Sequence, residues 1–296
     1  MNFTGERNED CGVKVLDLFS GIGGFSMGLE RAGMETVAFC EFDKNAQKVL
    51  KKHWPDVPIY DDVRTLDGKQ FRGSVDVVCG GFPCQDLSVA GKKAGFDGAR
   101  SSLYREMLRI IGECMPRYAI FENVTGLLTG ESGRWFGQFL YDLAEIGLNA
   151  EWHCIPASEL GAHHHRDRVW IIAYPKSERE GGKRPTSEQG KQSRSMYSEP
   201  SNPPQKVGNA ECRAREALIS QRVHAILQES NRKKEADRFS DTNGVIGGQW
   251  ATESSMGRVA DGVPRRSHRL KQLGNAVVPQ IPEIIGRAIM EASKNG

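Results

Sequence analysis

Two side chains combine reactive chemistry with positions that follow apolar runs. Cys84 follows the run Val75–Cys79 and a Gly-Gly-Phe-Pro turn, and Glu122 follows the run Tyr118–Phe121. Open α/β sheets place reactive groups outside the carboxyl ends of their strands, so these two side chains are predicted to converge. A thiolate is a strong nucleophile, and a carboxyl group can hydrogen-bond a heterocycle that takes up charge. A structural role is the commoner one for an isolated cysteine, and the pairing with Glu122 is what favours catalysis.

A glycine-rich loop, DLFSGIGGFS at residues 17–26, follows the first apolar run and opens a helical pattern. Its glycines permit a ligand to approach the backbone closely at a helix N-terminus. Ser26 occupies the third glycine position of the GxGxxG pattern, which argues against a dinucleotide with a pyrophosphate. A glycine turn that serves packing alone is the alternative.

Three side chains beyond this loop complete a candidate adenosine pocket. Glu41, about twenty residues after the glycines, can accept hydrogen bonds from ribose hydroxyls. Phe42 can pack on a purine, and Asp62 can accept from an adenine amino group. Each acid alone is typical of a solvated surface charge. Together with the loop they predict a pocket that suits S-adenosylmethionine as readily as a dinucleotide.

A run of three histidines, residues 163–165, precedes Arg166 and Arg168. Consecutive side chains point in different directions, and no cysteine or acid has metal-site spacing, so a metal site is disfavoured. The two arginines lie two apart in an extended segment and are predicted to point to the same side. They could hold a carboxylate, a phosphate or a carbonyl oxygen. Ordinary surface arginines are the alternative.

The elements that must position these groups form a βαβ pattern from Val13 to about Tyr174. This pattern predicts an α/β fold with a mostly parallel sheet. Helical spacing predicts helices over residues 102–114 and 136–146, and a final helix that starts near Pro279 and docks back onto the sheet. The predicted strands are Lys14–Leu18, Thr36–Cys40, Val75–Cys79, Tyr118–Phe121 and Val169–Ala173.

Composition sets the remaining limits. The chain has 296 residues, and its odd number of cysteines, seven, argues against a secreted domain held together by disulfides. Its formal net charge of +2 gives no indication of a nucleic-acid partner. Neither a signal peptide nor a long apolar span is apparent, so a cytoplasmic protein is expected. Residues 1–12 are expected to form a loose N-terminus. The polar composition of residues 175–249 predicts an inserted, partly flexible lobe.

Taken in order, DLFSGIGG, CEFDKNAQ, YDDV, GGFPCQDLS, ENV, RDR and LGNAVVPQ resemble the motifs of the cytosine-C5 DNA methyltransferases of bacterial or phage type. The resemblance covers about residues 13–174 and 250–292. It implies a Rossmann-like, S-adenosylmethionine-dependent catalytic domain at 13–174 and a target-recognition lobe at 175–249. It also implies that the segment 250–296 returns to the catalytic domain. The expected activity is DNA methylation to 5-methylcytosine in restriction-modification.

The resemblance further implies a role for each motif residue. Cys84 would add to C6 of a flipped-out cytosine, and Glu122 would hydrogen-bond its N3 and exocyclic amine. Arg168 would contact O2, with Arg166 supporting the same pocket. The cofactor is expected to be S-adenosylmethionine, released as S-adenosylhomocysteine, and no metal is expected. The implied cofactor-binding residues are Phe19, Ser20, Gly21, Ile22, Gly23, Gly24, Glu41, Phe42, Asp62, Val63, Pro83, Asn275 and Ala276. The implied DNA-binding residues are Gln85, Ser88, Lys92, Lys93 and Arg100.

Three stretches depart from the family pattern. His163 and His164 stand where Pro-Gln is most common, residues 175–249 resemble no assignable lobe, and residues 251–270 lack the usual Arg and Gly-Phe-Pro pattern. A tRNA cytosine-C5 methyltransferase is the first alternative, disfavoured by FPCQ and the absence of that branch's Cys-Phe-Thr tripeptide. A catalytically silent DNA-binding relative is the second, and an NAD-dependent enzyme is the third. The partner is expected to be double-stranded DNA, approached by a monomer.

Overall fold

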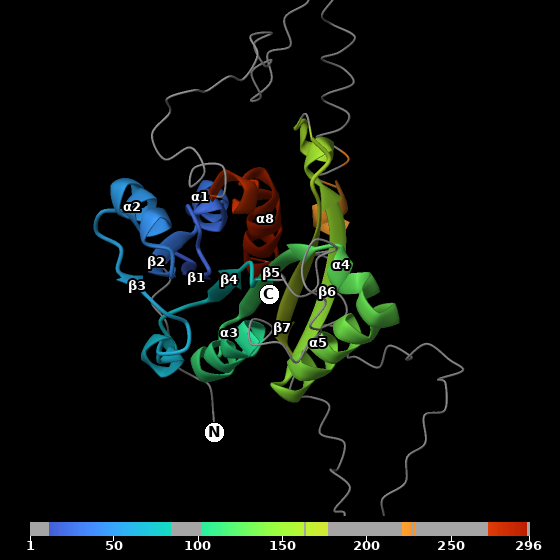
Figure 1. The fold of residues 1–296 in the computed structure, drawn as a ribbon, viewed down its shortest axis with the longest axis horizontal. Helices are drawn as coiled ribbons and strands as arrows, with labels where there is room; N and C mark the ends of the chain where they lie inside the picture. Colours follow the sequence, from blue (N-terminus) through green and yellow to red (C-terminus); the bar gives the residue numbers. More distant parts are fainter. Residues whose placement is uncertain are drawn as a thin grey trace, which may run out of the picture.

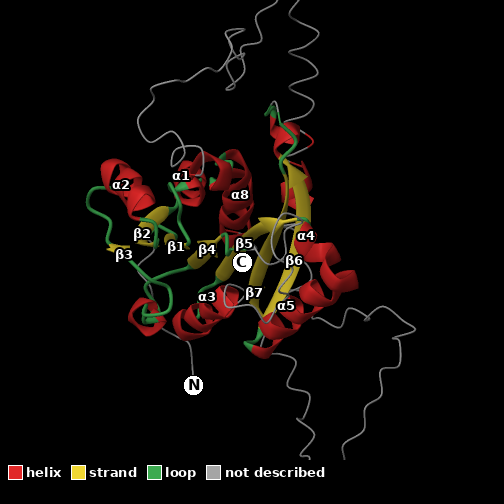
Figure 2. Cartoon of the chain, in the orientation of Figure 1, coloured by secondary structure: helices red, strands yellow, loops and turns green. Residues whose placement is uncertain are grey.

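A twisted sheet with helices on both faces forms the centre of the protein (Figures 1 and 2). The structure is a computed structural model that describes residues 12–83, 102–162, 164–176, 221–225, 228 and 272–294. The sheet has seven strands in the order β3-β2-β1-β4-β5-β7-β6. The strands are β1 (Lys14–Leu18), β2 (Glu35–Cys40), β3 (Ile59–Tyr60), β4 (Val77–Gly80), β5 (Tyr118–Val124), β6 (Leu148–Pro156) and β7 (Asp167–Pro175).

The sheet is mostly parallel, so the predicted fold class is confirmed. β1 pairs in parallel with both β2 and β4, and β4 pairs in parallel with β5. β7 is antiparallel to β5 and to β6. Because chain order reverses on the two sides of β1, a crevice is expected outside the carboxyl ends of β1 and its neighbours.

Helices cover the two faces of the sheet (Figure 2). α1 and α8 lie on one face, and α3 and α5 lie on the other (Figure 1). The α-helices are α1 (Gly24–Arg31), α2 (Lys44–His53), α3 (Ser102–Cys114), α4 (Gly126–Thr129), α5 (Arg134–Glu145) and α8 (Gln280–Lys294). Short 3₁₀ turns are η1 (Gly68–Phe71), η2 (Gly130–Gly133) and η3 (Ala157–Leu160).

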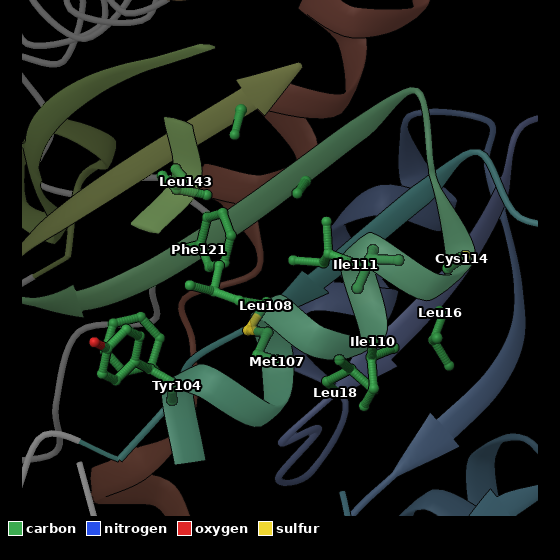
Figure 3. Close-up of a cluster of buried hydrophobic side chains, with 14 of the residues drawn as sticks. Leu16, Leu18, Tyr104, Met107, Leu108, Ile110, Ile111, Cys114, Phe121 and Leu143 are labelled. Atoms are coloured by element: carbon green, nitrogen blue, oxygen red, sulfur yellow. The ribbon is translucent and has the colours of Figure 1, made fainter. Parts of the chain in front are cut away.

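Each face has its own apolar core. On the α3 face, Met107, Ile110 and Ile111 pack over Leu16 and Leu18 of β1 (Figure 3). Phe121 of β5 and Leu143 of α5 continue this cluster. On the other face, α1 and α8 pack with buried residues of β1, β4, β5 and β7. Burial of a core on both faces fixes the strands whose ends carry the candidate chemistry.

The C-terminal helix α8 lies directly against α1. A methyl group added at Gly28 of α1 would come within 2.2 Å of the carbonyl oxygen of Pro279, so the two backbones are in close contact. Ile285, Ala288 and Ile289 of α8 are fully buried in the same core. The far end of the chain therefore completes a face of the sheet that the first strands begin.

Part of the segment expected to form a separate lobe packs on this face as well. Val223 is fully buried in the α1–α8 core, and Arg222 forms an ion pair of 3.0 Å with Glu291 of α8. The division at residues 175 and 249 stays a prediction, because most of that segment lies outside the described residues. Among the helices that the structure describes, none is long and apolar enough to cross a membrane.

Candidate functional site

A pocket of about 700 Å³ opens at the carboxyl ends of β1, β2, β4 and β5. Nine of the residues implied for cofactor binding line it, as do Glu122, Arg166 and Arg168. The nine are Phe19, Gly21, Ile22, Glu41, Phe42, Asp62, Val63, Pro83 and Asn275. The crevice predicted from strand order therefore brings most of the candidate residues to one place.

Glu41 is fixed between the glycine loop and the start of α2. Its Oε2 accepts a hydrogen bond of 2.7 Å from the backbone N–H of Gly21, and its Oε1 accepts one of 2.6 Å from the backbone N–H of Asp43. Gly21 has a φ of +55°, a conformation that glycine adopts without strain. Each carboxylate oxygen keeps a further lone pair for a ligand hydroxyl.

Phe42, the next residue, is 72% exposed although it is a large apolar side chain. It lies at the pocket. Aromatic side chains in ligand sites commonly offer a ring face to a planar ligand. Its exposure and position suit a stacking surface for a base.

Asp62 lies at the same pocket, where it is held by Arg64. The backbone N–H of Arg64 and its Nε each donate to Oδ1 at 3.0 Å, and the guanidinium also contacts Oδ2. Hydrogen bonds from Arg64 lower the pKa of the Asp62 carboxyl, so it is ionised and an acceptor at neutral pH. Sequence reasoning missed Arg64, which also lines the pocket. The opposite charges of Asp62 and Arg64, two residues apart in the sequence, were the available signal.

Four of the residues implied for cofactor binding do not line the pocket. The Ser20 hydroxyl donates to the carbonyl oxygen of Asp17 at 2.6 Å. A methyl group at Gly24 would lie 2.6 Å from the carbonyl oxygen of Val277, and one at Gly23 would overlap the ring of Trp54. The carbonyl oxygen of Ala276 accepts from Arg166. Packing, the alternative interpretation of the glycine loop, accounts for Gly23 and Gly24.

Asp17 lies beneath the loop, fully buried. The hydroxyl of Ser26 donates to its Oδ2 at 2.7 Å, which ties the end of β1 to the first turn of α1. Burial raises the pKa of Asp17 from 3.8 to about 7, against the opposing effect of hydrogen bonds from Ser26 and Cys79. The sequence contained no signal for this shift, because it depends on how completely the folded chain covers the carboxyl group.

Glu122 and Arg168 form the second part of the site. Arg168 Nε lies 2.9 Å from Glu122 Oε1, and the side chains are 22% and 13% exposed. β5 and β7 pair so that Val124 lies opposite Arg168. Burial raises the pKa of Glu122, while the charges of Arg168 and Arg166 act in the opposite direction. A carboxyl group in this state can exchange a proton with a ligand more readily than a solvated one.

Arg166 reaches different partners from Arg168. Its Nη1 donates to the carbonyl oxygen of Gly274 at 2.8 Å, and its Nη2 donates to that of Ala276 at 2.7 Å. Both arginines line the pocket, but Arg168 pairs with the carboxylate of Glu122, whereas Arg166 donates to the backbone of the distant segment 274–276.

The residues that immediately precede Cys84 in the sequence lie at the same pocket. Pro83 is a lining residue, and a methyl group at Gly81 would lie 3.0 Å from Glu122 Oε2. Asn123, a buried residue that sequence reasoning left without a role, donates from Nδ2 to the carbonyl oxygen of Phe82 at 3.1 Å. Its place beside Glu122 was the only signal in the sequence. Asn123 therefore fixes the backbone that precedes Cys84.

Several predicted residues lie outside the described part of the chain. They are Cys84, Gln85, Ser88, Lys92, Lys93, Arg100 and His163. Their roles stay predictions. Within the described ranges, no group of three or more His, Cys, Asp or Glu side chains could hold a metal ion.

Comparison with known proteins agrees with this arrangement of motifs. Residues 13–252 match the family model of the C-5 cytosine-specific DNA methylases. The type II methyltransferase M.Eco47II of Escherichia coli is 38% identical over 161 residues, which are 54% of this chain and 39% of that protein. The type II methyltransferase M.HpaII of Haemophilus parainfluenzae is 34% identical over 180 residues, which are 59% of this chain and 50% of that protein.

Among solved structures, the Entamoeba histolytica methyltransferase EhMeth matches with a TM-score of 0.48 and 19% identity, over 56% of this chain and 53% of that one. The matches span half of the length of these curated relatives or less. The family model, by contrast, matches well over half of this chain, and the family expected from the motifs is confirmed. The chain therefore belongs to the family of C-5 cytosine-specific DNA methylases.

Proposed function

We propose that the protein is a DNA (cytosine-5-)-methyltransferase that modifies a cytosine within a short duplex sequence. The observation that carries this proposal is the partly buried Glu122–Arg168 pair, which shares a pocket with Glu41 and Phe42. A base-recognising acid and a nucleoside-binding carboxylate in one pocket suit a methyl transfer between a nucleoside cofactor and a base. The type II methyltransferases among its relatives point to a role in restriction-modification.

The described residues fit S-adenosylmethionine. A pocket of about 700 Å³ falls within the range usual for small-molecule sites, roughly 300–1,000 Å³. Glu41 would accept from the ribose hydroxyls, Phe42 would face the adenine, and the backbone at Gly21 would lie near the methionine end. When bound, the cofactor supplies the methyl group.

The protein's own groups would act on the cytosine. The base must leave the stack, because its C6 face is blocked within the duplex. The Cys84 thiolate would add to C6, which makes C5 nucleophilic toward the methyl group. Once C5 carries the methyl group, loss of the C5 proton to a base would expel the thiolate and release 5-methylcytosine. Glu122 would hydrogen-bond N3 and the exocyclic amine, and because burial raises its pKa, it can share a proton with N3 more readily than a solvated carboxyl group can. Arg168 holds Glu122 in place and contacts O2.

The direct experiment incubates the purified protein with S-adenosylmethionine and duplex DNA of diverse sequence, followed by single-base mapping of 5-methylcytosine. We expect methylation at one short recurring sequence. Cys84→Ser should abolish it while S-adenosylhomocysteine still binds, because the thiolate acts in the transition state. A Cys84→Ser variant that methylates normally would refute the mechanism.

Glu122→Gln should lower turnover at least tenfold, the order expected when a positioned acid is lost. Glu145→Gln, at an exposed position on α5, is the matched control and should leave turnover unchanged. A parallel reaction with tRNA tests the alternative substrate. Methylation of tRNA alone would replace the proposed DNA substrate, and absence of any cofactor binding would refute the proposed enzyme class.

A further inference from the structure

One wall of the pocket comes from the far end of the chain. Gln272, Gly274 and Asn275 line the pocket beside the glycine loop and the end of β5. Immediately beyond, Val277 packs on Gly24, and α8 continues onto α1. The position of the segment 272–276 must therefore be fixed relative to pocket residues that come mostly from the first part of the chain.

Arg166 holds this segment by two hydrogen bonds. Its guanidinium donates to the carbonyl oxygens of Gly274 and Ala276, 108 and 110 residues away in sequence. A planar guanidinium can address two acceptors at once in a fixed geometry, which a lysine cannot do. Hydrogen bonds from a charged donor are stronger than neutral ones. The two bonds bracket Asn275, the residue between them that faces the pocket.

The backbone at Arg166 adopts an uncommon conformation to make these contacts. Its φ is +43°, in the left-handed region that residues with a side chain rarely occupy. Such a conformation persists only where surrounding contacts require it, and it gathers at functional sites. The change of direction at Arg166 comes one residue before β7 begins and lets Arg166 and Arg168 bind different groups.

We infer that Arg166 is a positioning residue for the cofactor half of the site, which fixes the segment 272–276 as a pocket wall and so sets the affinity for the nucleoside cofactor. This inference rests on the proposed function. It differs from the role that the sequence resemblance implies for Arg166, support of the cytosine pocket. Arg168 then serves the base through its ion pair with Glu122.

The test replaces Arg166 by glycine, because glycine suits the positive φ and removes the side chain that carries the guanidinium. Binding of S-adenosylhomocysteine is measured by calorimetry. Amide hydrogen exchange is followed for a peptide that covers residues 272–280. We expect R166G to weaken binding at least about tenfold, the order expected for loss of charge-assisted hydrogen bonds, and to speed exchange in that peptide.

Arg168→Ala should abolish turnover yet leave S-adenosylhomocysteine affinity within about threefold, since Arg168 bonds the base-side acid. Arg287→Ala removes an exposed ion pair with Glu283 on α8 and is the control for a lost arginine near this end of the chain. It should change neither measurement. R166K should bind with intermediate affinity, because an ammonium replaces the charge but not the planar fork.

Added methylguanidinium should restore part of the affinity of R166G, compared with sodium chloride at equal ionic strength, which a general loss of stability would not allow. Unchanged affinity and exchange in R166G would overturn the inference. If R166G does not fold, wild-type affinity in R166K would overturn it instead. If the wild type itself fails to bind S-adenosylhomocysteine, the proposed function fails. In that case the exchange rates of residues 272–280 still decide whether Arg166 holds this segment.

Discussion

Replacing Asp17 by asparagine should make the folded protein more resistant to alkaline pH. Asp17 is fully buried, and burial raises its pKa from 3.8 to about 7. Below pH 3.8 the carboxyl group is protonated in both the folded and the unfolded chain. Between pH 3.8 and 7 the unfolded chain loses this proton while the folded chain keeps it, so stability falls as pH rises. Above about pH 7 both forms are ionised and the loss is complete.

The size of this effect follows from the pKa shift. Each unit corresponds to 1.36 kcal/mol, so the full loss is on the order of 4 kcal/mol. Between pH 5 and pH 8.5 the share that remains to be lost is about 3 kcal/mol. Asn at this position keeps an oxygen that can accept from Ser26 but has no charge to bury. Its stability should therefore lack this pH-dependent loss.

The assay is urea unfolding at several values between pH 5 and pH 8.5, with coincident fluorescence and circular dichroism transitions. The stability of Asp17→Asn relative to the wild type should increase with pH by about 3 kcal/mol and level off above pH 7 to 8. Asp56→Asn, at an exposed turn, serves as the control and should show no such trend. A stability difference between wild type and Asp17→Asn that stays constant with pH would refute the reasoning.

Three further substitutions probe the pocket. Phe42→Ala should weaken S-adenosylhomocysteine binding about tenfold by calorimetry. It should change the free energy of unfolding by less than about 0.5 kcal/mol, because Phe42 is 72% exposed. Gly81→Ala should lower kcat at least about tenfold with cofactor affinity unchanged, since the new methyl group would lie 3.0 Å from Glu122 Oε2; normal kcat would contradict this. Asn123→Ala removes the bond to the Phe82 carbonyl and should cost about 1–3 kcal/mol in urea unfolding; wild-type stability would contradict it.

Local sequence pattern was sufficient for several elements. The predicted bounds of β1 and α3 agree with the structure. The helical apolar period of α3 defines the face that it buries, and the short apolar run of β1 is buried on both faces of the sheet. β6 was missed, because Leu148–Pro156 mixes polar and apolar residues without a buried face of its own. It becomes a strand through its antiparallel pairing with β7, a contact that no local sequence pattern predicts.

The sequence by itself determined the family, a mostly parallel sheet, and the strands near whose carboxyl ends Glu41 and Glu122 stand; the structure extends the strand that carries Glu122 by three residues, to Val124. Each of these features can be recognised from a motif or an apolar pattern whose own residues are close together in the sequence. Tertiary structure alone decided which groups the two arginines bind, since Gly274 and Ala276 lie more than a hundred residues from Arg166. It also decided the pKa of Asp17, because burial is a property of the packed chain and not of the residues beside the carboxyl group.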